Sequence, residues 1–580
     1  MAEKIIEFKN FGFQYNAQQK PTLYDINLTV NKGEKLLIAG PSGCGKSTLV
    51  HCINGLIPFS YRGEMTGSLT LYGKETKDLS LFEISQHVGT VLQDSDAQFV
   101  GLTVAEDIAF SLENDCVGEP ELHERVNKVA QLVNIKEFLT NAPGDLSGGQ
   151  KQRVSVGGVL VDDVDILLFD EPLASLDPAT GKQAIELIDE MQKYTGAAVV
   201  IIEHRLEDVL HCAVDRVVLM ESGHIIADTT SDELLSGNLL KDNGIREPLY
   251  ITALKYAGVS ITPDKLPSNI NTVVIDNEDA EKVRNWFKMT PPYERRHLEE
   301  SVLTTEHLKF RYEKGDYEAL RDISVDIKRG EMLAIVGTNG AGKTTFSKVV
   351  CGFENKTDGS ILFAGSDFDT LSIKEKAEHI GYVMQNPNQM ISKVMIYDEV
   401  ALGLKLRNVP DEEIDKKVEI ALKTCGLWKF RKWPVSALSY GQKKRVTIAS
   451  ILVLQPEMII LDEPTAGQDF RHYTDIMEFL EELNNNGITV VMITHDMHLM
   501  LEYATRAVVF SNGTIIADDM CSNILTDSEI VKTASLKETS LYELAKKCNI
   551  DDPRAFVQRF IDYERNNIRK KDENNAEVRP

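Results

Sequence analysis

The sequence predicts an α/β chain made of two tandem copies of one domain, each with a mostly parallel sheet covered by helices. Short β-branched runs such as KLLIAG (35–40) and AAVVIIE (197–203) alternate with longer helical stretches such as AIELIDEMQKYT (184–195). This alternation is typical of βαβ units. The same ordered set of phrases then recurs about 290 to 300 residues later, a period that indicates a duplicated domain. In such sheets, ligands bind at the carboxyl ends of the strands.

Length and composition narrow the class of protein. A chain of 580 residues is too long for one ordinary core. Its formal charge of -26 argues against a nucleic-acid binder that works by broad electrostatic attraction. The eight cysteines form no CxxC pair, so neither a disulfide framework nor a zinc site is indicated, and a reducing cytosol is expected. No signal peptide or membrane-spanning run is apparent, so any work at a membrane is expected to go through partners.

The repeated phrases set the expected domain boundaries. We expect one domain at residues 1–236 and its copy at 301–525, with helical subdomains at about 94–160 and 386–450. Residues 237–300 contain a stretch with four prolines and little apolar periodicity, which predicts a small appended segment and a linker. Residues 526–580 are expected to form a helical extension that ends in a polar tail.

Two glycine loops carry the first recognisable chemistry. In the pattern GxxxxGK[ST], backbone N–H groups surround phosphate oxygens, the lysine reaches the β and γ phosphates, and the hydroxyl residue ligates Mg²⁺. Each loop follows an apolar strand and opens a predicted helix, which predicts two ATP and Mg²⁺ sites. The predicted loop residues are Gly40, Pro41, Ser42, Gly43, Cys44, Gly45, Lys46, Ser47 and Thr48, and then Gly337, Thr338, Asn339, Gly340, Ala341, Gly342, Lys343, Thr344 and Thr345.

The second motif with recognisable chemistry is an acidic pair at the end of a hydrophobic strand. In ILLFDEP and MIILDEP, Asp170 or Asp462 can hold Mg²⁺ through water. The adjacent Glu171 or Glu463 is then placed to polarise an attacking water. Phosphoryl transfer needs mainly positioning and charge neutralisation, so these groups suffice for hydrolysis.

These motifs, in this order, resemble the ATP-binding cassette (ABC) family, with two P-loop (RecA-like) nucleotide-binding domains fused in one chain. The resemblance covers roughly residues 4–230 and 302–525. It implies that Tyr15 and Tyr312 stack on adenine, although a strand aromatic in the core is the alternative. It also implies that Gln93 and Gln385 contact Mg²⁺ or the water and that His204 and His495 contact the γ phosphate. Asp177 and Asp469 would lie in the loop that links the two sites.

The phrases LSGGQKQR (146–153) and LSYGQKKR (438–445), called the signature phrases below, act in trans in this family. The resemblance implies that Ser147 and Gly149 complete the site of Lys343, and that Ser439 and Gly441 complete the site of Lys46. Two ATP sites would therefore form between the two halves of one chain, and both should hydrolyse ATP. Tyr440 replaces the first glycine of the second phrase, which predicts a modest difference between two working sites.

The phrases after each glutamine, DAQFVGLTVAEDIAFSLEN and PNQMISKVMIYDEVALGLKL, are similar to those of the fused double ATPases of energy-coupling factor importers. The resemblance implies a transmembrane coupling subunit and a small substrate-binding membrane subunit as partners, at the cytoplasmic face of the cell membrane. The cargo would be a vitamin or a transition-metal ion, with thiamine or its pyrimidine precursor, cobalt and nickel among the candidates. The chain itself would touch neither the cargo nor nucleic acid.

Two other functions remain open at this point. A soluble double-cassette ATPase that acts on ribosomes would be expected to carry a long, often basic helical linker, whereas this linker is short and mixed in charge. A sugar-importer double ATPase is also fused, but it typically has a more divergent second phosphate loop or signature.

Overall fold

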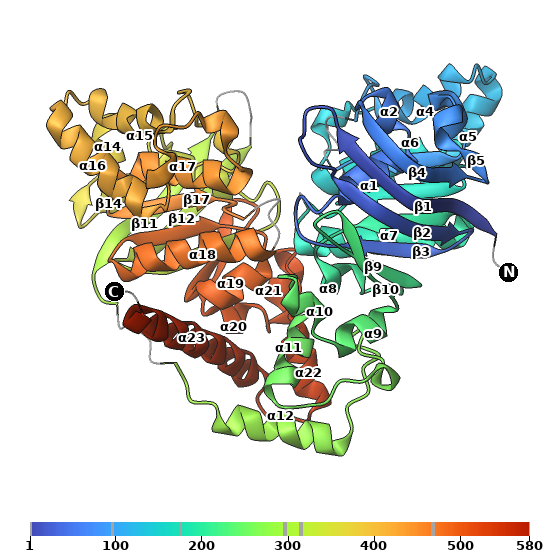
Figure 1. Ribbon diagram of the computed structural model, residues 1–580. Coiled ribbons are helices and arrows are strands. Elements are labelled where there is room, and N and C mark those ends of the chain that lie inside the picture. Colours follow the sequence, from blue (N-terminus) through green and yellow to red (C-terminus); the bar gives the residue numbers. More distant parts are fainter. Residues whose placement is uncertain are drawn as a thin grey trace. The chain divides into compact units, whose positions relative to one another are not determined.

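The computed structural model describes residues 3–93, 98–174, 176–293, 298–312, 317–465 and 470–578. The chain divides into two compact units. The main part of the first ends at Val283, and the main part of the second begins at Arg284. Each unit carries one copy of the repeat (Figure 1). No helix within the described residues is long and apolar enough to cross a membrane.

The first unit has two sheets. A four-stranded antiparallel sheet has the order β2-β1-β4-β5, and a six-stranded sheet has the order β10-β9-β3-β8-β7-β6. In the larger sheet every pairing is parallel except that of β9 with β10. The strands are β1 (Lys4–Tyr15), β2 (Leu23–Asn31), β3 (Lys35–Ala39), β4 (Gly63–Leu71), β5 (Lys74–Glu75), β6 (Val88–Val91), β7 (Ile166–Asp170), β8 (Ala198–Ile202), β9 (Arg216–Glu221) and β10 (His224–Thr229).

The helices of this copy fall in the connections between strands. Two helices follow β3, and one precedes β6. Three form the helical subdomain, and the rest follow β7, β8 or β10. They are α1 (Lys46–Ile53), α2 (Leu56–Phe59), α3 (Leu81–Ser85), α4 (Val104–Asn114), α5 (Glu119–Leu132), α6 (Gly148–Leu160), α7 (Pro178–Thr195), α8 (Leu206–Val209), α9 (Ser231–Ser236), α10 (Leu239–Asp242), α11 (Leu249–Tyr256) and α12 (Asn277–Met289).

The second unit repeats both sheets, with the orders β12-β11-β14-β15 and β16-β17-β18-β13-β19-β20. Read from the opposite end, the larger sheet has the same strand order as its counterpart, as the sequence repeat predicts. The strands are β11 (Ser301–Arg311), β12 (Glu318–Lys328), β13 (Met332–Gly337), β14 (Asp358–Phe363), β15 (Ser366–Asp367), β16 (Ile380–Val383), β17 (Met458–Asp462), β18 (Thr489–Ile493), β19 (Arg506–Ser511) and β20 (Thr514–Asp519).

Figure 1 shows the helical subdomain of this unit, α15 to α17, on one side of the sheets, and α23 on the opposite side. The helices are α13 (Lys343–Val350), α14 (Ile373–His379), α15 (Ile396–Lys405), α16 (Asp411–Thr424), α17 (Tyr440–Leu452), α18 (Phe470–Asn485), α19 (Met497–Tyr503), α20 (Cys521–Ile524), α21 (Ser528–Thr533), α22 (Ser540–Lys547) and α23 (Pro553–Val578).

Burial explains why the central strands read as unbroken apolar runs. Every residue of β3, β7 and β8 is buried, and the same holds for β13, β17 and β18. One face of each parallel sheet shares a core with the antiparallel sheet and with α1 or α13, and the strand residues of the other face are buried as well. Neither face is open to solvent, so the strands do not alternate. The first polar residues after each strand therefore mark the edge of the sheet where ligands bind.

Two segments differ from the sequence expectation. Residues 277–289, expected to be part of a linker, form α12, whose buried Ala280 and Val283 have helical spacing. Its Trp286 packs edge-on against Phe556 and Tyr563 of α23, with ring centroids 5.8 and 5.4 Å apart. The polar stretch 563–580, expected to be a tail, continues α23 as far as Val578. Packing of the aromatic residues at its start accounts for this, because tertiary contacts supply most of the stability of protein helices.

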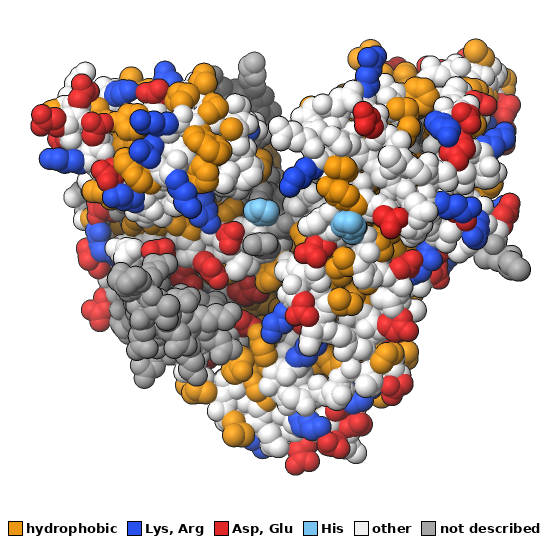
Figure 2. All heavy atoms as spheres, viewed as in Figure 1, with side chains coloured by type: hydrophobic (Ala, Val, Ile, Leu, Met, Phe, Trp, Pro, Cys, Tyr) orange, Lys and Arg blue, Asp and Glu red, His pale blue; other side chains and the backbone are white. Residues whose placement is uncertain are grey.

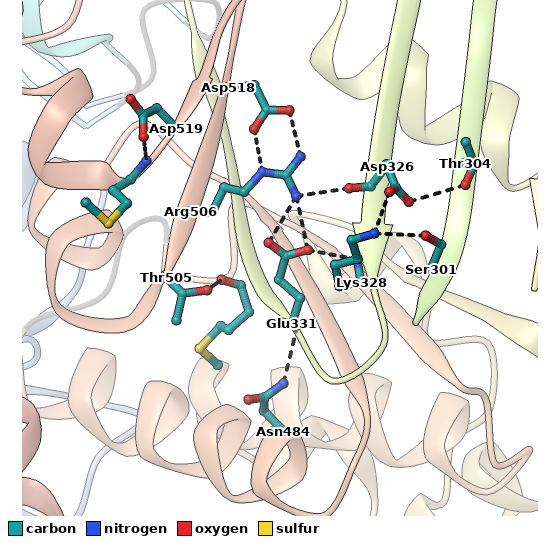
Figure 3. A network of polar contacts seen from close by, with 12 residues as sticks. Ser301, Thr304, Asp326, Lys328, Glu331, Asn484, Thr505, Arg506, Asp518 and Asp519 are labelled. Atoms are coloured by element: carbon teal, nitrogen blue, oxygen red, sulfur yellow. Dashed lines mark hydrogen bonds and ion pairs between the residues drawn. The ribbon is translucent and has the colours of Figure 1, made fainter. Parts of the chain in front are cut away.

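An ion-pair network joins the two sheets of the second unit (Figure 3). The Arg506 guanidinium on β19 donates to both carboxylate oxygens of Asp518 on β20. It also donates to the Glu331 carboxylate at 3.1 and 3.2 Å and to the Asp326 carbonyl on β12 at 3.0 Å. The Glu331 side chain is only 5% exposed, so its charge depends on this partner.

Arg506→Met should therefore destabilise the second unit. We expect a loss of roughly 2 to 3 kcal/mol, because the Glu331 carboxylate would stay buried with its cation gone. Denaturant unfolding, with hydrogen exchange to assign the transition to residues 284–578, measures the change. Lys309→Met is the control, since it breaks only the exposed pair with Asp358 and should cost less than about 0.5 kcal/mol. Equal unfolding of the two variants would contradict the prediction.

Candidate nucleotide-hydrolysis sites

Each phosphate loop begins at a glycine that no other residue could replace. Gly40 follows β3 with φ +155°, and a Cβ there would lie 2.3 Å from the Met220 carbonyl oxygen of β9. Gly337 ends β13 with φ +136°, and a Cβ there would lie 1.9 Å from the Phe510 carbonyl oxygen of β19. Both conformations and both contacts exclude an L side chain. The loops therefore leave the sheet in the same direction in the two copies.

The loop lysines are buried and turned onto the loop backbone. Lys46 donates to the carbonyls of Gly40 and Pro41 at 2.7 and 2.8 Å. Lys343 donates to the carbonyls of Gly337 and Thr338, both at 2.8 Å. The ammonium group thus lies within the curve of the loop, where phosphate oxygens are expected. At the tip of each loop the residues are exposed: Ser42, Gly43, Asn339 and Gly340.

Cys44 and Ala341 occupy the same position in the two loops and are both buried. The Cys44 thiol lies 3.8 Å from the Lys46 ammonium. Burial nevertheless raises the pKa of this thiol, with Lys46 opposing the shift. Cys44 therefore acts as a small filler.

The two tyrosines lie beside the phosphate loops in the same way. The hydroxyl groups of Tyr15 and Tyr312 each lie 3.1 Å from a threonine hydroxyl, that of Thr48 or Thr345. Each ring meets a phenylalanine of its own strand edge-on. Tyr312 is 41% exposed, so its ring face is open to a stacked base.

The acidic pairs meet the hydroxyl residues of the loops. Asp170 accepts from Ser47 at 3.4 Å, and Asp462 accepts from Thr344 at 3.1 Å. The next residues, Glu171 and Glu463, have φ +49° and +45°, the left-handed region that non-glycine residues rarely adopt. Their N–H groups each donate at 2.9 Å to the last residue of the neighbouring strand. Strain of this kind is concentrated at functional sites, where the surroundings enforce it.

The electrostatics of these carboxylates favour a bound cation. Burial raises the pKa of Asp170 and of Glu171 above their usual values. Burial and the adjacent Asp462 raise the pKa of Glu463 to about 8. A hydroxyl and a carboxylate oxygen at each loop form the hard oxygen donor set that Mg²⁺ prefers, and the side-chain amide of Gln93 lies beside the acidic pair of the first copy. The residues present therefore fit Mg²⁺.

The glutamine and histidine residues behave differently in the two copies. In the first, the Gln93 amide donates to Glu171 at 2.7 Å, and the His204 ring nitrogen lies 3.9 Å from Glu171. In the second, His495 lies closer to Glu463, at 3.3 Å. The Gln385 side chain is exposed, and its backbone carbonyl accepts the bonds described below.

The signature phrases are helix capping boxes. Ser147 and Ser439 are the N-caps of α6 and α17, and each accepts from the backbone N–H of a glutamine three residues later. That glutamine side chain accepts in return from the serine N–H. A capped helix start with free backbone N–H groups suits an anion. Gly149 follows in α6, and Gly441 in α17.

Asp177 is the N-cap of α7, where its carboxylate accepts from the N–H and the hydroxyl of Thr180 at 2.9 and 3.0 Å. This contact gives Asp177 a structural role at the start of the helix. Asp469, expected to be its counterpart, lies outside the described residues.

Three site residues were not predicted from the sequence. Glu203 is fully buried and accepts from the N–H groups of Leu173, His204 and Arg205 at 3.3, 2.8 and 3.1 Å. Tyr382 donates to Asp462 at 2.9 Å. The third is Lys444 of α17, whose pKa burial lowers to about 8 although Asp462 and Glu463 oppose the shift. The sequence does distinguish these three positions, because the two copies differ at each of them. The aligned residues in the other copy are, in the same order, Thr494, Thr90 and Gln152.

Four groups at neighbouring strand ends define a P-loop nucleoside triphosphatase: a phosphate loop, an Asp-Glu pair, a histidine and a glutamine. The capping-box signature helix narrows the class to the ATP-binding cassette. Comparison with known families agrees: the ABC transporter family matches residues 23–174 and 320–466. The chain belongs to the ATP-binding proteins of ABC transporters, and it is an ATPase. A second family, described as ATP-binding cassette cobalt transporter, matches residues 237–310.

Several proteins are similar over nearly the whole chain. A relative from Clostridium perfringens, which bears the provisional name ABC transporter ATP-binding protein, is 59% identical over 97% of this chain and 98% of its own. One of the same name from Enterococcus faecalis is 55% identical over 97% and 99%. Among solved structures, cbiO1 from Clostridium perfringens, titled part of the ABC transporter complex cbiONQ, is 34% identical over 44% of this chain and 98% of its own, with a TM-score of 0.38.

Glu203→Gln should loosen the first site. An amide cannot accept from three N–H groups as a carboxylate does, so the loop after Glu171 and the His204 segment lose their common anchor. We expect the amide hydrogens of Leu173, His204 and Arg205 to exchange on the order of tenfold faster. ATP turnover should fall by about half or more, since one of two sites is affected. Glu190→Gln, at an exposed position, is the control, and unchanged exchange in Glu203→Gln would refute the anchoring role.

Proposed function

We propose that this chain is the ATPase of an energy-coupling factor importer, bound at the cytoplasmic face of the cell membrane, and that it powers uptake of a transition-metal ion, cobalt in the first place. The observation that carries the proposal is the match of residues 237–310, between the two cassettes, to the family described as ATP-binding cassette cobalt transporter. Vitamins such as thiamine or its pyrimidine precursor are the alternative cargo.

Exposed apolar side chains support docking of a membrane partner. Leu102 and Val394 are 83% and 74% exposed, and each lies just before the first long helix of its helical subdomain, α4 or α15. Hydrophobic side chains lie among charged ones on the surface of the second subdomain (Figure 2), and Leu406 and Trp433 are also exposed there. Solvent-facing apolar groups at matched positions in two copies favour a partner surface. In the proposal, this partner is the transmembrane coupling subunit, which joins a small substrate-binding subunit.

The roles of the site residues follow from their positions. Lys46 and Lys343 would bind the β and γ phosphates, and the loop N–H groups would hold the phosphate oxygens. Mg²⁺, held by the hydroxyl and aspartate oxygens, would neutralise phosphate charge. Glu171 and Glu463 would orient the attacking water, as water-positioning groups do in other nucleoside triphosphatases. His204 and His495, close to these glutamates, would contact the γ phosphate.

We also propose, on the resemblance of the signature phrases to those of the family, that Ser147 and Gly149 serve the site of Lys343. Ser439 and Gly441 would serve the site of Lys46 in the same way. Asp177 and Asp469 would lie on the connection between the two sites. Each copy would then contribute to both hydrolysis events, which gives the fusion a function.

Glu171→Gln and Glu463→Gln should each lower ATP turnover to about half or less, and the double variant should lose on the order of 100-fold, the contribution of a general base. Steady-state phosphate release measures this. Glu190→Gln should retain full turnover. Wild-type turnover in either single variant would contradict two working sites.

The same phosphate-release assay tests which signature phrase serves which ATP site. Ser147→Arg added to Glu463→Gln should lower turnover little further, since both changes fall in one site. Ser147→Arg added to Glu171→Gln should lower it as far as the double glutamate variant does. The reverse order would assign the phrases the other way.

Affinity purification of the full chain from detergent-solubilised membranes should recover two membrane subunits. Cells that express the complex should accumulate radioactive cobalt. The double glutamate variant should accumulate none, because in the proposal ATP closes the two halves and only hydrolysis reopens them. Nickel and thiamine are the competing cargoes in the same uptake assay. Uptake of thiamine in place of cobalt would show that the cargo assignment is wrong. Recovery of the chain with ribosomes and without membrane subunits would overturn the importer assignment itself.

A further inference from the structure

In the second copy, the signature helix α17 holds the loop that carries Gln385. This loop, residues 384–395, runs from the end of β16 to the start of α15 and is called the Gln385 loop below. The Tyr440 hydroxyl donates to the Gln385 carbonyl at 3.1 Å. The Lys444 ammonium donates to the carbonyls of Met384 and Gln385 at 2.9 and 2.8 Å. Residues four apart lie on one face of a helix, so the two side chains reach the same two peptide groups.

The burial of Lys444 shows that this contact is held firmly. Its side chain is 1% exposed, and a buried ammonium group is costly unless its protons are satisfied. The two loop carbonyls accept two of its three protons, so releasing the loop would leave a desolvated cation short of acceptors. Lys443 adds a third attachment, because it donates to the Asn388 side chain at 3.3 Å.

The end of the Gln385 loop that precedes α15 is held by hydrogen bonds, and so is the equivalent segment before α4 in the first copy. In the second, the N–H groups of Ser392 and Lys393 donate to Glu399 of α15 at 2.9 and 2.7 Å. In the first, the N–H groups of Val100 and Gly101 donate to Asp107 of α4 at 2.8 and 3.1 Å. This anchor belongs to the shared scaffold and does not distinguish the copies.

The near end differs between the copies. Gly148 stands where the second copy has Tyr440, and it has no side chain to reach the loop. Gln152 stands where the second copy has Lys444, and its amide donates to the Pro172 carbonyl at 2.8 Å. Gln152 therefore links the first signature helix to the segment after Glu171, whereas Lys444 links the second to the segment that contains Gln385.

We propose that Tyr440 and Lys444 are positioning residues of the second copy, which fix the backbone of Met384 and Gln385 to α17 so that the signature helix and the start of the Gln385 loop move as one piece. The proposal rests on the proposed function of Gln385 at the ATP site. In this proposal Tyr440 is more than a tolerated replacement of glycine, because its hydroxyl makes a contact of its own. Motion of α17 is thereby passed directly to the loop of its own copy, and the first copy lacks these two side chains.

The test uses the full-length chain with Tyr440→Phe, which removes only the hydroxyl, and Lys444→Gln, which installs the residue of the first copy. Hydrogen exchange of peptides covering residues 384–391 should become on the order of tenfold faster in Lys444→Gln, and faster by a smaller factor in Tyr440→Phe. Exchange in β17 should stay unchanged, which shows that the fold is intact. Lys417→Met, which removes a partly exposed lysine of α16 that pairs with Glu413 on the same helix, is the matched control.

ATP turnover provides the readout that a purely structural role would not move. We expect kcat to fall by about half or more in Lys444→Gln while KM for ATP stays within about twofold, because the lysine positions Gln385 and does not bind the nucleotide. Unchanged exchange in both variants would overturn the tether. Faster exchange with unchanged kcat would overturn the positioning role. Neither assay involves a membrane subunit or a cargo. The exchange and turnover results can therefore be interpreted even if the importer assignment fails.

Discussion

The structure depends on one constraint, which is that four neighbouring parallel strands end at the same edge of a sheet. In the first copy these are β3, β8, β7 and β6, and they are followed by the phosphate loop, the histidine, the Asp-Glu pair and the glutamine in that order. Residues more than 100 positions apart thereby meet within hydrogen-bond distance, as Ser47 and Asp170 do. Since strand spacing in a sheet is fixed, the chemistry is assembled by the register of the sheet and needs little help from the connecting helices.

The two copies share this scaffold and differ in the residues that support it. A buried carboxylate, Glu203, anchors the backbone around the first site, and a threonine stands at the same position in the second. In the second copy a phenol, Tyr382, donates to the strand-end aspartate, where the first copy has Thr90. Each of these differences changes charge or hydrogen bonding close to the acidic pair while leaving the phosphate loop alone. The residues proposed to contact the nucleotide are thus retained in both copies, and their surroundings differ.

Sequence reasoning found what depends on local spacing. The phosphate loops and the Asp-Glu pairs are short patterns with known chemistry. The structure has the predicted duplicated α/β fold, and these patterns lie at the ends of its strands. Sequence reasoning missed Glu203, Tyr382 and Lys444, because their roles arise from contacts between segments 30 to 80 residues apart along the chain. It also missed α12, whose apolar residues have helical spacing but are few, so that packing against α23 reveals what the pattern alone does not.

The bond from Tyr440 to the Gln385 carbonyl also bears on how such a protein can change over generations. In an assembly of two identical subunits, any codon change alters both sites at once, so a substitution must be acceptable in both. A chain that encodes the two copies separately is free of that condition. A tyrosine can enter one signature phrase and acquire a partner there, while the glycine of the other phrase is kept. Two copies encoded separately in one chain are thus open to separate selection.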